Sequence, residues 1–180
     1  MRANIIIHSV SGNLYLIAEA FSQHLQALGI DARVYRVQDP DLHIDAYERT
    51  EVNEYYEEIT ALPEAKNSKL LKADVIILGT PSRFGMPTAE MKVFLDQTWP
   101  LYTDGSLRGK KFYAFASSPV SEEDGMNAAM TLYHWSKLMG LENVPETPYV
   151  HKESELMPNR PTDEIDRFAV RLAARILSLG

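Results

Sequence analysis

Polar residues that could bind a ligand gather in three short stretches of the chain, and each stretch follows an apolar run. They are residues 9–14, 79–85 and 117–125. The first combines two serines with a glycine ahead of a helix-like segment, where hydroxyls, backbone N–H groups and the helix dipole favour a phosphate without any lysine or arginine. The second contains proline, arginine and phenylalanine, which suits a planar ligand at the end of a parallel strand. The sequence therefore predicts a site for a flat, phosphorylated molecule.

The segments that must position these stretches alternate between strand and helix patterns. Runs rich in β-branched or aromatic residues predict five strands, at 4–8, 32–37, 73–78, 111–116 and within 141–148. Apolar residues at helical spacing predict helices at 14–28, 67–72, 89–95, 126–139 and 163–179, the last capped by Thr162. This alternation predicts an α/β fold: a three-layer sandwich whose five-stranded parallel sheet, of order 2-1-3-4-5, carries helices on both faces. The three polar stretches then meet at the carboxyl ends of neighbouring strands.

The length of 180 residues is that of a single domain spanning 1–180. Residues 38–65 interrupt the alternation: they are acidic, rich in tyrosine and punctuated by Pro40 and Pro63. We interpret them as an insertion with a short surface helix near 54–59, because they hold too few apolar residues for a core of their own. Residues 101–109, with a turn at Asp104-Gly105, are predicted to form a loop.

Composition excludes several classes of function. The net charge of −7 argues against nonspecific nucleic-acid binding. No apolar run reaches the roughly 20 residues of a membrane span. The absence of cysteine excludes thiol catalysis and suits a reducing, cytoplasmic location. The five histidines form no metal motif, so no metal is expected, and His8 is predicted to be a buried core residue. Dinucleotide, Walker and G-x-S-x-G signatures are also missing.

Residues 79–98, GTPSRFGMPTAEMKVFLDQT, carry a specific resemblance. They are similar to the flavin-contacting loop and following helix of the WrbA-type NAD(P)H:quinone oxidoreductases, flavoproteins of flavodoxin-like fold. Family members carry Gly-Thr-Pro-Thr-Arg-Phe-Gly-Asn, then Met-Lys-x-Phe-Leu-Asp-Gln-Thr. Here Ser82 replaces the second Thr, and Met86-Pro87 replaces Asn-Met. Residues 9–14, SVSGNL, likewise resemble the loop that holds the FMN phosphate in this fold.

The resemblance implies FMN as cofactor and a set of residues that contact it. These are Ser9, Ser11, Gly12, Asn13, Leu14, Pro81, Ser82, Arg83, Phe84, Gly85, Ser117, Ser118 and Gly125. Phe84 and Tyr102 are expected to shape the substrate face, Tyr102 standing where the family has a tryptophan. The third stretch lacks the family's Gln-His pair. No side chain is expected to act as a conventional acid or base.

The implied reaction is the two-electron reduction of a quinone by NAD(P)H, with hydride passing through flavin N5. The implied partners are the quinone and the nicotinamide, and the implied assembly is a homodimer or homotetramer. Two alternatives remain open. One is a flavodoxin-type one-electron carrier, which shares the phosphate loop and the acidic charge. The other is an interaction module of the same fold that has lost FMN, which the altered third stretch allows.

Overall fold

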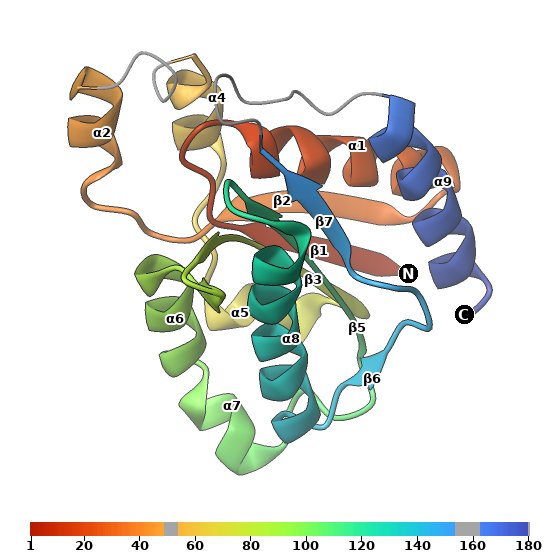
Figure 1. Cartoon of the computed structure of the whole chain (residues 1–180). Helices are drawn as coiled ribbons and strands as arrows, with labels where there is room; N and C mark the ends of the chain where they lie inside the picture. The colour runs from red at the N-terminus through yellow and green to blue at the C-terminus, as the bar shows by residue number, and fades with distance from the viewer. Residues whose placement is uncertain (49–53, 154–162, 180) are drawn as a thin grey trace.

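The computed structural model describes residues 1–48, 54–153 and 163–179. A parallel sheet lies between two layers of helices (Figure 1). Its parallel strands are β1 (Arg2–Ile7), β2 (Asp31–Arg36), β3 (Val75–Arg83), β5 (Lys111–Ser118), β6 (Glu142–Asn143) and β7 (Tyr149–Lys152), and the short β4 (Met86–Pro87) pairs antiparallel with the end of β3. The order is β2-β1-β3-β5, followed by β6 and β7, which both pair with β5. Counted as one interrupted strand, β6 and β7 complete the predicted order 2-1-3-4-5.

The helices divide between the two faces and the carboxyl edge of the sheet (Figure 1). One face carries α1 (Asn13–Ala27) and α9 (Asp163–Leu177), which pack against each other. The opposite face carries α5 (Asn67–Lys72), α6 (Ala89–Asp96), α7 (Trp99–Asp104) and α8 (Glu122–Leu138). Two further helices, α2 (Leu42–Glu48) and α4 (Tyr56–Ala61), lie beyond the carboxyl edge. The predicted three-layer α/β architecture is confirmed.

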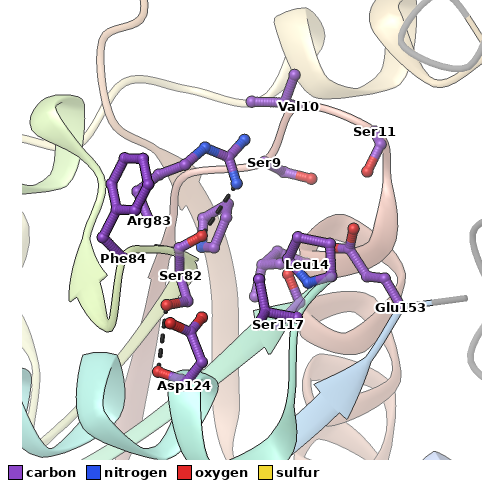
Figure 2. Close-up of a pocket in the computed structure, with 13 residues that line it drawn as sticks. Ser9, Val10, Ser11, Leu14, Ser82, Arg83, Phe84, Ser117, Asp124 and Glu153 are labelled. Carbon is purple, nitrogen blue, oxygen red and sulfur yellow. Dashed lines mark hydrogen bonds between the residues drawn. The ribbon is translucent and has the colours of Figure 1, made fainter. Parts of the chain in front are cut away.

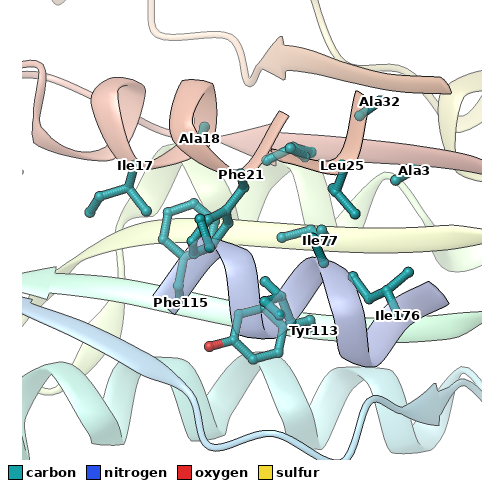
Figure 3. Packing of buried hydrophobic residues seen from close by; sticks show 14 of the residues in the cluster. Ala3, Ile17, Ala18, Phe21, Leu25, Ala32, Ile77, Tyr113, Phe115 and Ile176 are labelled. Atoms are coloured by element: carbon teal, nitrogen blue, oxygen red, sulfur yellow. The ribbon is translucent and has the colours of Figure 1, made fainter. Parts of the chain in front are cut away.

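Two apolar cores form because successive residues of a strand point to opposite faces of the sheet. In β1, Ile5 and Ile7 join the cluster beneath α1 and α9, whereas Ile6 joins the cluster beneath α6 and α8. All three isoleucines are fully buried. In the first cluster Phe21 of α1 meets Phe115 of β5 edge to face, with ring centroids 5.1 Å apart (Figure 3).

The fifth strand is broken, which corrects the expectation of one strand within 141–148. β6 pairs with Lys111 and Phe112, and β7 begins pairing again at Phe115. Pro145 and Pro148 stand between the two segments. Proline has no N–H to donate to a neighbouring strand, so the ladder is interrupted there.

Two other local expectations were wrong. Residues 99–104 form α7, although 101–109 was predicted to be a loop. Pro100 lies in the first turn of this helix, where a missing N–H breaks no helical hydrogen bond. Gly105 ends the helix in a left-handed conformation, with φ +67°. Strand β3 continues beyond its predicted end at residue 78 as far as Arg83, because it folds back into a hairpin with β4. Thr162, predicted as an N-cap, lies outside the described residues.

The described parts of the 38–65 segment pack onto the main body through a small apolar cluster. Leu42 and Ala46 of α2 and Ile59 of α4 surround Val10, which follows β1. The predicted surface helix near 54–59 is observed as α4, two residues later. That this segment is an insertion within one domain stays a prediction. In the part of the chain that the structure describes, no helix is long and apolar enough to cross a membrane.

Candidate functional site

A cavity of about 470 Å³ opens at the carboxyl ends of β1, β3 and β5. The three polar stretches predicted from the sequence meet around it (Figure 2). It is lined by Ser9, Val10, Ser11, Leu14, Pro81, Ser82, Arg83, Phe84, Ser117, Pro119, Val120, Asp124 and Glu153. Its position is that of ligand sites in open α/β sheets, outside the strand ends and beside the point where the strand order reverses.

Residues 9–14, here called the first loop, present backbone N–H groups at the start of α1. Gly12 is the residue before the helix and has φ +91°, a left-handed conformation that glycine adopts without strain. Within the described residues, the N–H groups of residues 11–14 donate no hydrogen bond. The Ser9 hydroxyl accepts the N–H of Tyr15 at 3.2 Å. This loop therefore has unsatisfied donors and the positive end of a helix dipole, as an anion site requires.

The second stretch is the tip of the β3–β4 hairpin. Phe84 and Gly85 form its two-residue turn, with φ values of +56° and +71°. Such turns favour Asn-Gly, because left-handed backbone strains most other side chains. Phe84 is nevertheless there and is 94% exposed. Strain of this kind persists where a side chain serves a function, and this aromatic ring stands at the rim of the cavity.

Arg83 also lies at the rim, and its Nη1 donates to the carbonyl of Ser82 at 3.0 Å (Figure 2). Among the described residues it forms no ion pair with a carboxylate. The alternative role for Arg83 was a surface salt bridge, and no carboxylate among the described residues pairs with it. Its guanidinium keeps donors available for a ligand in the cavity.

The third stretch divides between a strand and a helix, which corrects its prediction as a loop over 117–125. Ser117 and Ser118 end β5, and residues 122–125 belong to α8. The Ser121 hydroxyl caps α8 by accepting the N–H of Asp124 at 3.0 Å. The acidic run at 122–124 then lies in the first turn of the helix, where negative charge is favourable.

Ser117 and Asp124 supply the polar groups of this third wall. Ser117 is fully buried and lines the cavity, and its hydroxyl has no partner within the described residues. The Asp124 carboxylate accepts the Ser118 hydroxyl at 2.8 Å, while its backbone carbonyl accepts the Ser82 hydroxyl at 3.2 Å. The hydroxyls of Ser82 and Ser118 lower the pKa of the Asp124 carboxyl, which stays ionised. Asp124 therefore ties the second stretch to the third.

The structure brings some of the predicted contact residues to the cavity wall and not others. Those that line it are Ser9, Ser11, Leu14, Pro81, Ser82, Arg83, Phe84 and Ser117. Gly12, Asn13, Gly85 and Ser118 are next to lining residues in the chain but do not line it themselves. Tyr102 lies on α7 and does not line the cavity; its ring packs against that of Trp99 in a tilted arrangement, with centroids 5.1 Å apart. The contacts with FMN themselves stay a prediction.

Gly125 also lies off the cavity wall. A Cβ at this position would lie 2.4 Å from Cγ1 of Val150 on β7. The absence of a side chain at Gly125 thus permits α8 to pack closely on the sheet. Its predicted contact with FMN stays a prediction.

Several lining residues were not expected from the sequence: Val10, Pro119, Val120, Asp124 and Glu153. The Ser-Glu-Glu-Asp run at 121–124 is typical of a helix start, and it could have predicted that Asp124 lies in the first turn of a helix beside the end of β5. Glu153 follows the broken fifth strand, so its position depends on a feature that the sequence pattern did not reveal.

Comparison with known proteins agrees with this geometry. The family described as NADPH-dependent FMN reductase matches residues 1–155. The chain belongs to this family. A protein of Aromatoleum aromaticum named NAD(P)H dehydrogenase (quinone) is 30% identical over 99% of this chain and 96% of its own length. A protein of the same name from Trichlorobacter lovleyi is 33% identical over 81% of this chain and 72% of its own.

Solved structures show the same fold at lower identity. A flavodoxin, WrbA-like protein from Agrobacterium tumefaciens superposes with a TM-score of 0.69 at 17% identity, covering 98% of both chains. A flavodoxin from Streptococcus pneumoniae gives 0.71 at 19% identity and covers both chains fully. The predicted flavodoxin-like fold is confirmed.

The family's cofactor fits the residues present. At the start of α1, the four N–H groups of residues 11–14 have no acceptor in the part of the chain that the structure describes, which matches the needs of a phosphate monoester. The Ser117 hydroxyl also lines the cavity and has no hydrogen-bond partner within the described residues, so it is available to a ligand. Pro81, Phe84 and Val120 contribute apolar wall for a flat ring system.

Proposed function

We propose that this protein is an FMN-dependent oxidoreductase that reduces quinones with NAD(P)H, two electrons at a time. Family membership and the names of the curated relatives support the proposal. The single observation that carries it is the position of the cavity between the start of α1, whose first N–H groups have no acceptor within the described residues, and a strained, exposed aromatic turn. FMN, when bound, supplies the redox chemistry.

The side chains act by binding and orientation. The first loop would hold the phosphate through the N–H groups of residues 11–14. The buried Ser117 hydroxyl would satisfy one polar atom of the ring system. Arg83 and Phe84 at the rim would orient the substrates, the guanidinium by donating hydrogen bonds and the phenyl ring by covering a flat apolar surface. Asp124 would hold the second and third stretches in a fixed position relative to each other, through its hydrogen bonds with Ser82 and Ser118.

Anaerobic reduction tests this function directly. The FMN-loaded protein is mixed with NADH or NADPH, the flavin absorbance is followed, and benzoquinone is then added. Rapid bleaching by either donor, followed by full recovery with one equivalent of quinone, is the expected result. A one-electron carrier would be reduced slowly by both donors. A protein without FMN affinity would remain colourless after loading and desalting. Comparing the two bleaching rates also identifies the preferred donor.

We further propose a homodimer or homotetramer, and a cytoplasmic location, where reduced nicotinamide donors are available. Trp99 and Tyr102 of α7 support the proposed oligomer, because these two aromatic residues are in contact and are 65% and 43% exposed. Exposed aromatic pairs are frequent in protein interfaces. Light scattering of wild-type protein and of Trp99→Ser measures the assembly. A monomeric wild type would contradict the proposed oligomer.

A further inference from the structure

His8 forms a cluster with two carboxylates next to the cavity-lining residue Ser9. It follows β1 directly and precedes the first loop, and its side chain is 5% exposed. Its Nε2 lies 2.9 Å from Oδ2 of Asp39, whose side chain is 8% exposed. Its Nδ1 lies 3.7 Å from Oε2 of Glu90, in the first turn of α6. A buried hydrogen bond of this length between an imidazole and a carboxylate holds both side chains in one orientation.

Asp39 connects this cluster to the 38–65 segment. Its other oxygen, Oδ1, accepts the N–H of Asp41 at 3.1 Å, just before α2 begins at Leu42. The hydrogen bond from His8 lowers the pKa of Asp39, so its carboxylate stays ionised as the acceptor of both bonds. One carboxylate thus holds the end of β1 and the start of α2 together.

Beyond this bond, the described residues of α2 and α4 pack against the first loop itself. Leu42, Ala46 and Ile59 enclose Val10 of the loop. Tyr55, at the start of α4, lies over Gly12: a Cβ on that glycine would be 2.4 Å from Cδ2 of the tyrosine ring. The ring of Tyr55 also faces that of Tyr15, with centroids 6.0 Å apart. The loop is therefore braced from outside by residues distant in sequence.

We propose that His8 is a positioning residue for the first loop: its bond to Asp39 fixes the 38–65 segment against that loop and so holds the loop's N–H groups ready for the cofactor phosphate. This inference rests on the proposed FMN site. The N–H groups of residues 11–14 have no hydrogen-bond acceptor within the described residues, so they do not themselves stabilise the loop. Contacts from outside the loop can reduce the ordering cost of binding.

The proposal makes a specific distinction between two ligands. FMN carries the phosphate and riboflavin does not, while the ring system is the same. A loosened first loop therefore weakens binding of FMN and leaves binding of riboflavin nearly unchanged. General damage to the fold would weaken both, because the ring contacts would suffer as well.

The experiment measures dissociation constants for FMN and riboflavin by flavin fluorescence quenching, in wild type, His8→Leu, His8→Gln and Asp39→Asn. We expect His8→Leu and Asp39→Asn to weaken FMN binding about tenfold, the effect of losing one charge-assisted hydrogen bond, with riboflavin binding within about twofold of wild type. His8→Gln retains an amide N–H where Nε2 donates and recovers most of the FMN affinity. Should His8→Leu fail to fold, the Gln and Asn variants decide the question.

His24→Leu is the matched control. His24 on α1 pairs with Asp166 of α9 at 3.4 Å, and neither residue lines the cavity. Its loss is expected to leave both dissociation constants unchanged. Equal losses for the two ligands, or an unchanged FMN affinity in His8→Leu, would overturn the proposal. If wild-type protein binds FMN no more tightly than riboflavin, the proposed phosphate site itself is wrong.

Discussion

The backbone N–H of Tyr149 donates to the hydroxyl oxygen of Tyr113 at 2.7 Å, across the break in the fifth strand. The same hydroxyl donates to the carbonyl of Thr147 at 2.9 Å. Burial raises the pKa of Tyr113 well above its ordinary value, so the hydroxyl keeps the proton that it donates. A buried side chain thus replaces the strand pairing that Pro145 and Pro148 prevent.

Tyr113→Phe is expected to lower the free energy of unfolding by about 1–3 kcal/mol, because it leaves a backbone donor and a carbonyl unsatisfied. Urea denaturation measures the change. Tyr47→Phe, which alters a hydroxyl on a side chain 91% exposed, serves as the control and should change stability little. Equal effects of the two substitutions would show that the Tyr113 hydroxyl does not bridge the break.

Gly125→Ala is expected to destabilise the fold by about 1–3 kcal/mol, because the added methyl group meets Val150 at a distance no packed carbon tolerates. The double variant Gly125→Ala, Val150→Ala creates space and should recover part of the loss. Thermal unfolding of the single and double variants provides the comparison. No recovery in the double variant would point to a cause other than this contact.

Phe84→Asn is expected to stabilise the protein by about 1 kcal/mol, since Asn tolerates the left-handed conformation that strains Phe84. The same change should slow quinone reduction, because it removes the aromatic ring from the cavity rim. Phe84→Leu retains the strain and should not gain stability. If the Asn and Leu variants have equal free energies of unfolding, the turn at Phe84 is not strained.

Asp39 is expected to make stability depend on pH in the acid range. The His8 hydrogen bond lowers the pKa of Asp39 in the folded state, so the unfolded chain takes up its proton first as pH falls. The stabilisation is complete above the unfolded-state pKa, roughly 3.9, and is lost as pH falls through the folded-state pKa.

The difference in unfolding free energy between wild type and Asp39→Asn should therefore shrink as pH is lowered through this acid window. His8 faces this carboxylate, Glu90 lies on the other side of the His8 ring, and both are left unchanged in both proteins. Glu48→Gln, at an exposed carboxylate of α2, gives the baseline. A difference that stays constant across the window would contradict the assignment.

Much of this fold was predictable because its strands and helices carry clear apolar periodicities. Ile5, Ile6 and Ile7 indicate a strand buried on both sides, and the structure places them in the two cores. The three polar stretches were identified as neighbours because parallel strands end at one edge of the sheet. Both inferences need only local pattern and the rules of sheet topology.

The features that were missed depend on contacts between distant segments. The position of Glu153 on the cavity wall follows from the broken strand, which in turn depends on Tyr113. The contact between the end of β1 and the start of α2 is made by His8 and Asp39, which are 31 positions apart. A buried histidine was predicted, but no pattern in the sequence indicates which carboxylate it meets.

The interrupted fifth strand also bears on how the protein behaves at high concentration. β6 offers only two residues and β7 four, with prolines at 145 and 148 between them. A foreign β-strand needs a long uninterrupted row of free amides to extend a sheet. This border of the sheet therefore offers an added strand only two short rows of backbone groups, separated by prolines.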